Sequence, residues 1–260
     1  MAAVLHHRLP RLPWMEPALA RLPGVLPLDM ADWLEADAVF AGQMALRDGL
    51  LADRRDAVYA MTDGAGDASC ELLALILTHL GPGYSRKGDE VERPDGVVVA
   101  LDADAPLVTA ARLVQEDLCL HQRGTAGEHV LTGAVLCFPA SWSLAEKIGR
   151  PLSAIHGPVP AYDAGLAARV QRLFDGIRPG RPLWRQNALV YGSDQLHHPR
   201  TEAAPRREAL QAGRYVRSEK QCLLRLPKSD AVVFSIHTYL APLDSLPADA
   251  RAALLSLHGG

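Results

Sequence analysis

The sequence has no closely spaced cysteines, no excess of positive charge and no long apolar run. Its four cysteines, Cys70, Cys119, Cys137 and Cys222, lie far apart and form no CxxC pair. This spacing argues against a zinc ribbon, a thioredoxin-type redox motif or a cysteine-ligated iron–sulfur cluster within the chain. Isolated cysteines of this kind are mostly reduced and packed in the interior, so we expect a cytoplasmic protein.

Charge and hydropathy argue against two classes of partner. The formal net charge is -3, so there is no general basic excess that would attract nucleic acid. No run of 18 apolar residues is present, so we expect no membrane span. Pro10, Pro13 and Pro17 interrupt the N-terminal region before a continuous apolar stretch can form a signal peptide.

The length and composition of the chain suit one large folded unit. With 260 residues and 48% hydrophobic content, the chain can form a core large enough to enclose a cofactor. Residues 1–28 are rich in proline, which fixes φ and lacks an N–H donor, and this predicts an extended arm. We see no internal repeat, so the prediction is this arm followed by a single domain over residues 29–260.

Hydrophobic spacing predicts the secondary structure. Asp29 can cap a helix that continues to residue 53, and further helices are predicted at 68–80, 106–116, 143–148 and 164–177. Strands are predicted at 96–101, 130–138, 183–191, 215–226 and 231–240. Because helices come first and antiparallel strands later, the pattern favours the α+β class.

The first of three segments that could carry chemistry surrounds His156. The chain reads Pro-Leu-Ser-Ala-Ile-His-Gly-Pro-Val-Pro over residues 151–160, so the histidine ends an apolar turn that the Gly-Pro-Val-Pro unit must break. A neutral imidazole on a short, stiff segment is a suitable axial ligand for haem iron. A histidine at a helix end is more often a cap or a core residue, so spacing alone leaves both interpretations open.

The second segment, residues 215–227, alternates along an extended chain. Successive side chains of a strand point to opposite faces. One face would carry Arg217, Glu219, Gln221, Leu223 and Arg225. This row is either a solvated surface or the polar floor of a pocket, in which Glu219 holds an arginine in place to meet a ligand.

The third segment, residues 231–240, has apolar side chains on both faces and polar groups at the end of one. His237 and Tyr239 share that face. They could place two hydrogen-bond donors beside a bound ligand, or they could be structural residues at the end of a strand.

These segments together resemble the haem-dependent oxidative N-demethylase alpha-subunit family. The resemblance rests on Ile-His-x-Pro-Val-Pro, Arg-x-Asn, Arg-Ser-Glu-Lys-Gln-x-Leu-x-Arg-Leu-Pro and Phe-x-Ile-x-Thr-Tyr, which occur in this order between Trp33 and Leu243. It implies a PAS-like antiparallel sheet that encloses a haem b pocket. It also implies NADPH-driven, oxygen-dependent demethylation of a small secondary amine.

The resemblance assigns expected roles by position in these motifs. His156 is the expected proximal ligand of the haem iron, and Arg185 and Asn187 are expected to bind the cofactor. The expected catalytic residues, which would polarise bound oxygen or hold the amine, are Arg217, Glu219, Arg225, His237 and Tyr239.

The sequence departs from the family pattern at two positions. Ala188 follows Arg-x-Asn where relatives usually have tryptophan, and His237 stands where arginine is common. Both changes fall in the expected pocket, so the amine need not be dimethylamine.

The remaining interpretations differ in where the electrons come from and in whether the protein catalyses a reaction at all. The chain has no GxGxxG motif and no cysteine cluster, so flavin and iron–sulfur centres would lie on partner reductase subunits. One alternative is a haem-binding PAS-like sensor or carrier without turnover. Another is a structural subunit without haem, in which His156 caps a helix.

Overall fold

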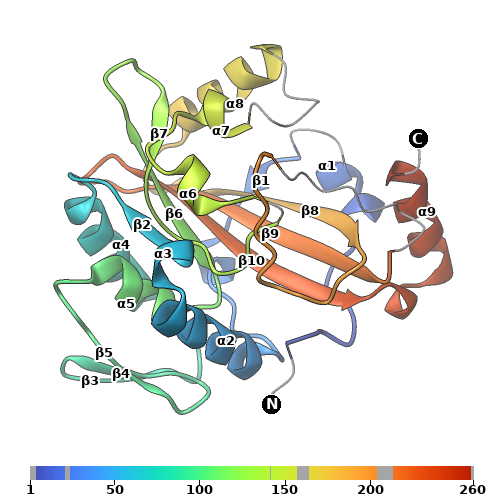
Figure 1. Ribbon diagram of the computed structural model, residues 1–260, viewed down its shortest axis with the longest axis horizontal. Helices are drawn as coiled ribbons and strands as arrows, with labels where there is room; N and C mark the ends of the chain where they lie inside the picture. Colours follow the sequence, from blue (N-terminus) through green and yellow to red (C-terminus); the bar gives the residue numbers. More distant parts are fainter. Residues whose placement is uncertain (1–3, 21–23, 141, 157–163, 204–212, 259–260) are drawn as a thin grey trace.

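The chain forms helices and antiparallel sheets, as the computed structural model in Figure 1 shows. The structure describes residues 4–20, 24–140, 142–156, 164–203 and 213–258, and for residues 156, 164–167 and 258 it describes the backbone alone. This mixture of elements confirms the α+β class that the sequence predicts.

The main sheet has seven strands in the order β1-β8-β9-β10-β6-β7-β2, and neighbouring strands are antiparallel. Its three long strands are β8 (Leu183–Tyr191), β9 (Tyr215–Arg225) and β10 (Val232–Pro242), close to their predicted bounds. The others are β1 (Leu26–Pro27), β2 (Tyr59–Met61), β6 (Asp117–Arg123) and β7 (His129–Val135). Strands β9 and β10 therefore lie in the interior of the sheet.

A second, small sheet lies beside the helices of the first half of the chain. It pairs β3 (Ser85–Lys87), β4 (Glu90–Glu92) and β5 (Val98–Ala100) in sequence order. Figure 1 shows it at the lower left, next to α5 (Pro106–Leu113).

The first face of the main sheet packs on the N-terminal half of the chain, and we call it the Trp33 face. Its core joins Val233 and Leu224 of the sheet to Trp33 and Leu72. The indole Nε1 of Trp33 donates to Ser235 Oγ at 2.9 Å, which fixes this segment against β10. The helices of this half are α2 (Phe40–Asp53), α3 (Arg55–Val58), α4 (Gly66–His79) and α5.

The opposite face packs on three helices between β7 and β8, and we call it the α8 face. They are α6 (Leu144–Lys147), α7 (Leu152–His156) and α8 (Ala164–Gly176). Leu152 and Phe174 of these helices share a buried cluster with Leu223 and Val232 of the sheet. In Figure 1, α7 and α8 lie together at the top of the view, away from α2 to α5.

The proline-rich N-terminal residues contain the short elements η1 (Pro13–Met15) and α1 (Pro17–Ala20). Leu9 shares a buried cluster with Leu254 of the C-terminal helix α9 (Ala248–His258). The remaining short turns are η2 (Met30–Asp32) and η4 (Leu243–Ser245). The division of the chain into an arm and one domain stays a prediction.

The predicted helix from Asp29 to residue 53 is wrong in its first part. Asp29 caps only the turn η2, by accepting a hydrogen bond from Ala31 N at 3.0 Å, and α2 begins at Phe40. The backbone N–H groups of residues 35 and 37 instead donate to the side chains of residues 116 and 115, at 3.0 Å each. These long-range bonds compete with helix formation, and no local sequence pattern reveals them.

Strand β6 was not predicted, and α5 ends at Leu113 instead of residue 116. Residues 117–121 are buried throughout, because β6 lies between β10 and β7 and both of its faces are covered. A strand covered on both faces lacks the alternation of polar and apolar residues that would identify it. None of the helices in the described part of the chain is long and apolar enough to cross a membrane.

Candidate functional site

Two rows of side chains cross the α8 face at the middle of the long strands. In one row Arg185, Gln221 and Ile236 are cross-strand neighbours, and in the next row Asn187, Glu219 and Thr238 are. Side chains directly opposite each other on antiparallel strands share a face and lie within contact distance. The sheet therefore brings Arg185, Asn187 and Glu219 together on one face.

The carboxylate of Glu219 is held by three donors. Arg217 Nε donates to Oε1 at 3.1 Å, while Gln221 Nε2 and Asn187 Nδ2 donate to Oε2 at 3.1 and 3.4 Å. The amide oxygen of Asn187 in turn accepts from the backbone N of Glu219 at 3.1 Å. This carboxylate is therefore fixed in position, with little capacity left for a further cation.

The guanidinium of Arg217 is surrounded by contacts that stabilise the fold. Besides Glu219, its guanidinium donates to the carbonyl oxygen of Leu196 at 3.1 Å and to that of Phe138. The residue is 1% exposed, and its guanidinium lies 5.8 Å from the ring centroid of Tyr191. Arg217 thus joins the segments at 138 and 196 to the sheet.

Arg225, at the other end of β9, likewise bonds to backbone carbonyl groups of distant segments. Its guanidinium donates to the carbonyl oxygens of Phe174 and Ile177 at 2.6 Å each, and to that of Asp230 at 2.9 Å. These carbonyls include the C-terminal end of α8, where a cation is favourable. Arg225 therefore fastens α8 to the sheet.

Arg185 differs from both, because it makes no hydrogen bond within the described ranges. The residue is half-buried, and its Nε atom is buried without a partner. Burial lowers the pKa of its guanidinium, an effect that the nearby Glu219 opposes. The hydroxyl of Thr238 is likewise buried and has no partner in the described part of the chain. Unpaired buried polar groups are rare, and each calls for a ligand or water that satisfies it.

His156 is the last residue of α7, a helix that covers the same face. Leu152 shares a cluster with Leu223, and Ile155 packs against a cluster that contains Cys119 and Ile236. The imidazole of His156 lies outside the described side chains, so its role as iron ligand stays a prediction.

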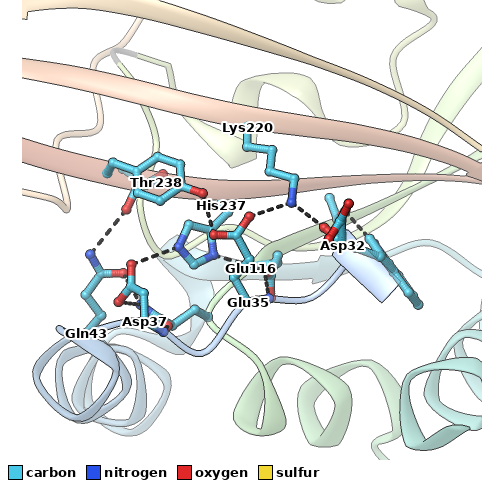
Figure 2. Close-up of polar contacts among 12 residues, drawn as sticks. Asp32, Glu35, Asp37, Gln43, Glu116, Lys220, His237 and Thr238 are labelled. Carbon is cyan, nitrogen blue, oxygen red and sulfur yellow. Dashed lines mark hydrogen bonds and ion pairs between the residues drawn. The ribbon is translucent and has the colours of Figure 1, made fainter. Parts of the chain in front are cut away.

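His237 and Tyr239 point away from these residues, onto the Trp33 face. Both are out of phase with Thr238, whose cross-strand neighbour is Glu219. Figure 2 shows His237 between two carboxylates: Nδ1 donates to Glu116 Oε1 at 2.9 Å and Nε2 donates to Asp37 Oδ2 at 3.1 Å. The structure therefore separates the expected catalytic residues into two groups on opposite faces.

The polar network around His237 is buried and strongly charged. Burial would lower the pKa of His237, but hydrogen bonds to Asp37 and Glu116 outweigh it and raise the pKa to about 10. Burial would raise the pKa of Asp37, but its hydrogen bonds with His237 and His6 outweigh that effect and lower it. An imidazolium paired with carboxylates is the dominant state at neutral pH.

Tyr239 and Lys220 extend this network through Glu35. The Tyr239 hydroxyl donates to Glu35 Oε2 at 2.6 Å, and burial together with this carboxylate raises the tyrosine pKa. Lys220 Nζ lies 2.5 Å from Glu35 Oε1 and also donates to the carbonyl oxygen of Asp32 (Figure 2). These contacts hold residues 32–37 against the sheet.

A family model described as "Haem-dependent oxidative N-demethylase, alpha subunit-like" matches residues 24–257. The chain belongs to this family. The resemblance seen in the sequence motifs is thereby confirmed, and the matched range contains every expected site residue. The family description gives haem dependence and oxidative N-demethylation at the level of the family.

The α8 face of this N-demethylase family member carries the kinds of side chain that would contact a haem. Leu223 and Ile236, which are buried against the covering helices, and the half-buried Phe234 are apolar, and Arg185 is a cation that makes no hydrogen bond within the described ranges. Within the described ranges there is no group of three or more His, Cys, Asp or Glu side chains that could hold a bare metal ion. Haem carries four nitrogen ligands of its own, so it needs no such group.

Sequence reasoning missed the partners of His237 and Tyr239. Glu35 and Asp37 fall inside the predicted N-terminal helix, and Asp37 is separated from His237 by 200 positions. The alternation within β10 does place His237 and Tyr239 on one face. Which face of the sheet that is depends on the register with β9, and a single sequence does not show the register.

Proposed function

We propose that the chain binds haem b between the α8 face and helices α7 and α8, and that it activates oxygen for the N-demethylation of a small alkylamine. The observation that carries the proposal is Arg185, a half-buried arginine whose Nε has no partner among the described residues. It lies on the face covered by the helix that carries His156. Family membership supports both the cofactor and the reaction type.

We propose a PAS-like fold for the sheet. The support is the strand order: the hairpin β6-β7 is followed by helices that cover one face, and then by β8, β9 and β10, with β10 returning beside β6. The connection between β7 and β8 thus forms a wall opposite the sheet. The space between such a wall and the sheet is where a PAS-like protein encloses a ligand.

Three residues would hold the cofactor. His156 would ligate the iron, and Arg185 and Asn187 would face the porphyrin from the sheet. When bound, haem supplies a redox-active iron at which dioxygen can be reduced. The free donors of Arg185 would stabilise negative charge, either on a haem carboxylate or at the oxygen side of the pocket.

The other polar residues of the α8 face would act mainly by positioning. Glu219 fixes Asn187 and Arg217, because its carboxylate already accepts from both. Arg217 and Arg225 hold the two segments that border the site. We therefore propose that Glu219 orients its neighbours Asn187 and Arg217 and does not contact the amine directly.

His237 and Tyr239 would contribute from the Trp33 face. They hold residues 32–37 against β10, the strand whose opposite side carries Ile236 and Thr238. Their proposed role is thus to fix the pocket floor from behind, with no contact to the amine.

Electrons would come from NADPH through reductase subunits that carry flavin and iron–sulfur centres. The description "alpha subunit-like" supports an enzyme of several subunits. We propose a cytoplasmic location, which the four free cysteines support.

The test is amine-dependent oxygen consumption by the purified protein, reconstituted with haem and supplied with a surrogate NADPH reductase. We expect oxygen uptake and release of formaldehyde with small N-methylamines. Arg185→Gln should reduce the rate at least about ten-fold, the effect of losing one charge-stabilising donor. Arg181→Gln, at an exposed position of the same segment, should leave the rate unchanged.

Two results would contradict the proposal in different ways. Protein that takes up haem but consumes no oxygen with any amine is a sensor or carrier. If the protein takes up no haem, it is neither an N-demethylase subunit nor a haem-binding sensor or carrier, and the cofactor assignment is wrong.

A further inference from the structure

Helix α8 meets strand β7 at one buried histidine. His129 lies two residues before Leu131 on β7, so both side chains point to the α8 face, and His129 is 0% exposed. Its backbone N donates to Gln171 Oε1 of α8 at 3.2 Å, and Gln171 Nε2 lies 3.1 Å from His129 Nδ1. Phe174 of α8 packs on the same imidazole, with 5.5 Å between the ring centroids.

These contacts fix the protonation state of His129. A backbone N–H can only donate, so the amide oxygen of Gln171 is the atom that faces it. The NH2 group of the same amide then donates to His129 Nδ1, and also to Asp175 Oδ1 at 3.0 Å. Because Nδ1 accepts, the ring is neutral and carries its single proton on Nε2. The bond between α8 and this ring therefore requires an uncharged imidazole.

A second proton on His129 is incompatible with this arrangement. A proton on Nδ1 would face the NH2 group of Gln171, so two donors would oppose each other. Rotation of the amide would relieve that contact. The NH2 group would then face the backbone N–H of His129, and the amide oxygen would face the carboxylate of Asp175. Neither orientation of Gln171 satisfies a charged ring.

The cations around His129 disfavour an imidazolium as well. Burial lowers the pKa of His129, and the charges of Arg225 on β9 and Arg123 on β6 lower it further. His121 of β6 packs on the same Phe174 ring, with 5.3 Å between the ring centroids. Protonation of His121 would act on His129 in the same direction as the two arginines.

Asp175 of α8 is the group that acts in the opposite direction. Its Oδ1 lies 3.8 Å from His129 Nδ1, and its charge raises the pKa of the imidazole. That oxygen already accepts from Arg123 and from Gln171. Its effect is smaller than that of burial and the cations, so the neutral ring is favoured while α8 is in place.

We propose that His129 makes the attachment of α8 to the sheet sensitive to pH: the neutral ring holds the helix, and protonation of Nδ1 loosens it. Arg225 stays charged and continues to hold the carbonyl groups at the C-terminal end of α8. The attachment through His129 does not depend on a cofactor. Only its consequence, wider access to the α8 face in acid, rests on the proposed function.

The experiment measures amide hydrogen exchange of the purified full-length protein at about pH 7.5 and about pH 5.5. Protection factors remove the intrinsic effect of pH on exchange, and β10 serves as the internal reference for global opening. In the loosened state the ring regains its ordinary pKa of 6.5, so acid favours that state. We expect the protection of α8, relative to β10, to be about ten-fold lower at the lower pH, as linkage predicts for one such group.

Three variants assign the effect to this contact. His129→Asn places an amide oxygen near the position of Nδ1, so α8 should stay attached and its protection should no longer depend on pH. Gln171→Glu places a carboxylate against Nδ1, which favours the imidazolium, so α8 should be better protected at the lower pH than at the higher. His7→Asn changes an exposed histidine and should behave as the wild type does.

The outcomes decide the inference without reference to haem. If the protection of α8 falls no more than that of β10 in the wild type, or falls as much in His129→Asn, the inference is overturned. If His129→Asn does not fold, Gln171→Glu decides: a reversed pH dependence supports the inference, and a fall like that of the wild type overturns it. None of these results involves haem uptake, so failure here leaves the proposed function intact.

Discussion

Single residues on both faces of the main sheet include paired and unpaired polar groups. On the Trp33 face, His237 and Tyr239 hydrogen-bond to carboxylates, while Glu116 Oε2 is buried without a partner in the described part of the chain. On the α8 face, Arg217 bonds to Glu219 and to the backbone, while Arg185 Nε has no partner among the described residues. Paired groups stabilise the fold, and the guanidinium of the half-buried Arg185 is a cation that a ligand could contact.

The pairing of His237 predicts how stability depends on pH. Its folded pKa of about 10 lies above the ordinary 6.5, so its charged form is stabilised by folding. This contribution is fully present below pH 6.5 and is lost as the pH rises toward 10. We expect the free energy of unfolding, measured with urea at several pH values, to fall across this range.

The variant His237→Gln isolates this effect. It removes the cation between Asp37 and Glu116, and we expect a loss of about 3 to 5 kcal/mol at neutral pH. The decline between pH 6.5 and 10 should then be smaller than in the wild type. The control Ala74→Ser alters an exposed position of α4 without changing any titratable group, and its pH profile should match the wild type. An unchanged decline in His237→Gln would contradict the assignment.

Residue roles could be predicted from the sequence only where they depend on local order. The alternation along residues 215–225 correctly groups Arg217, Glu219 and Arg225 on one face. Their partners are carbonyl groups of distant segments, such as Phe138 and Ile177. No sequence pattern shows which backbone carbonyl a side chain will bond, so the sequence does not predict that Arg217 and Arg225 hold distant segments together.

At the scale of elements, the sequence predicts the long strands and helices α4, α5 and α8, but not helix α9 or the connections between elements. Strands β8 to β10 and helix α4 lie close to their predicted bounds, because their hydrophobic periodicity is long and regular. The turn η2 and strand β6 depend on tertiary contacts. Which helices cover which face also follows from register and crossover, which one sequence does not specify.

The attachment of α8 to the sheet gives a prediction at this scale. Arg225→Gln removes the guanidinium that bonds the carbonyls of Phe174 and Ile177, and we expect a loss of about 2 to 4 kcal/mol. Amide hydrogen exchange should show α8 losing protection more than β10, because the bonds fasten the helix. Arg172→Gln, at an exposed position of α8, is the matched control. Equal protection of α8 in both variants would show that Arg225 does not hold the helix.

At the scale of the whole molecule, both faces of the main sheet are covered by buried clusters, and they differ in their polar residues. The Trp33 face carries the charged network around His237. The α8 face carries Arg185, whose Nε has no partner among the described residues, and it packs on the helix that ends at His156. Because the family description names haem, we propose the α8 face as the side on which haem binds.

The most direct test of this account is a haem titration of the purified protein, followed by its absorption spectrum, for the wild type and His156→Ala. The account predicts a Soret band that saturates at one haem per chain in the wild type and is lost in His156→Ala. Circular dichroism checks that the variant stays folded. A wild-type protein that remains colourless, or a folded His156→Ala protein that takes up haem as tightly as the wild type, would contradict it.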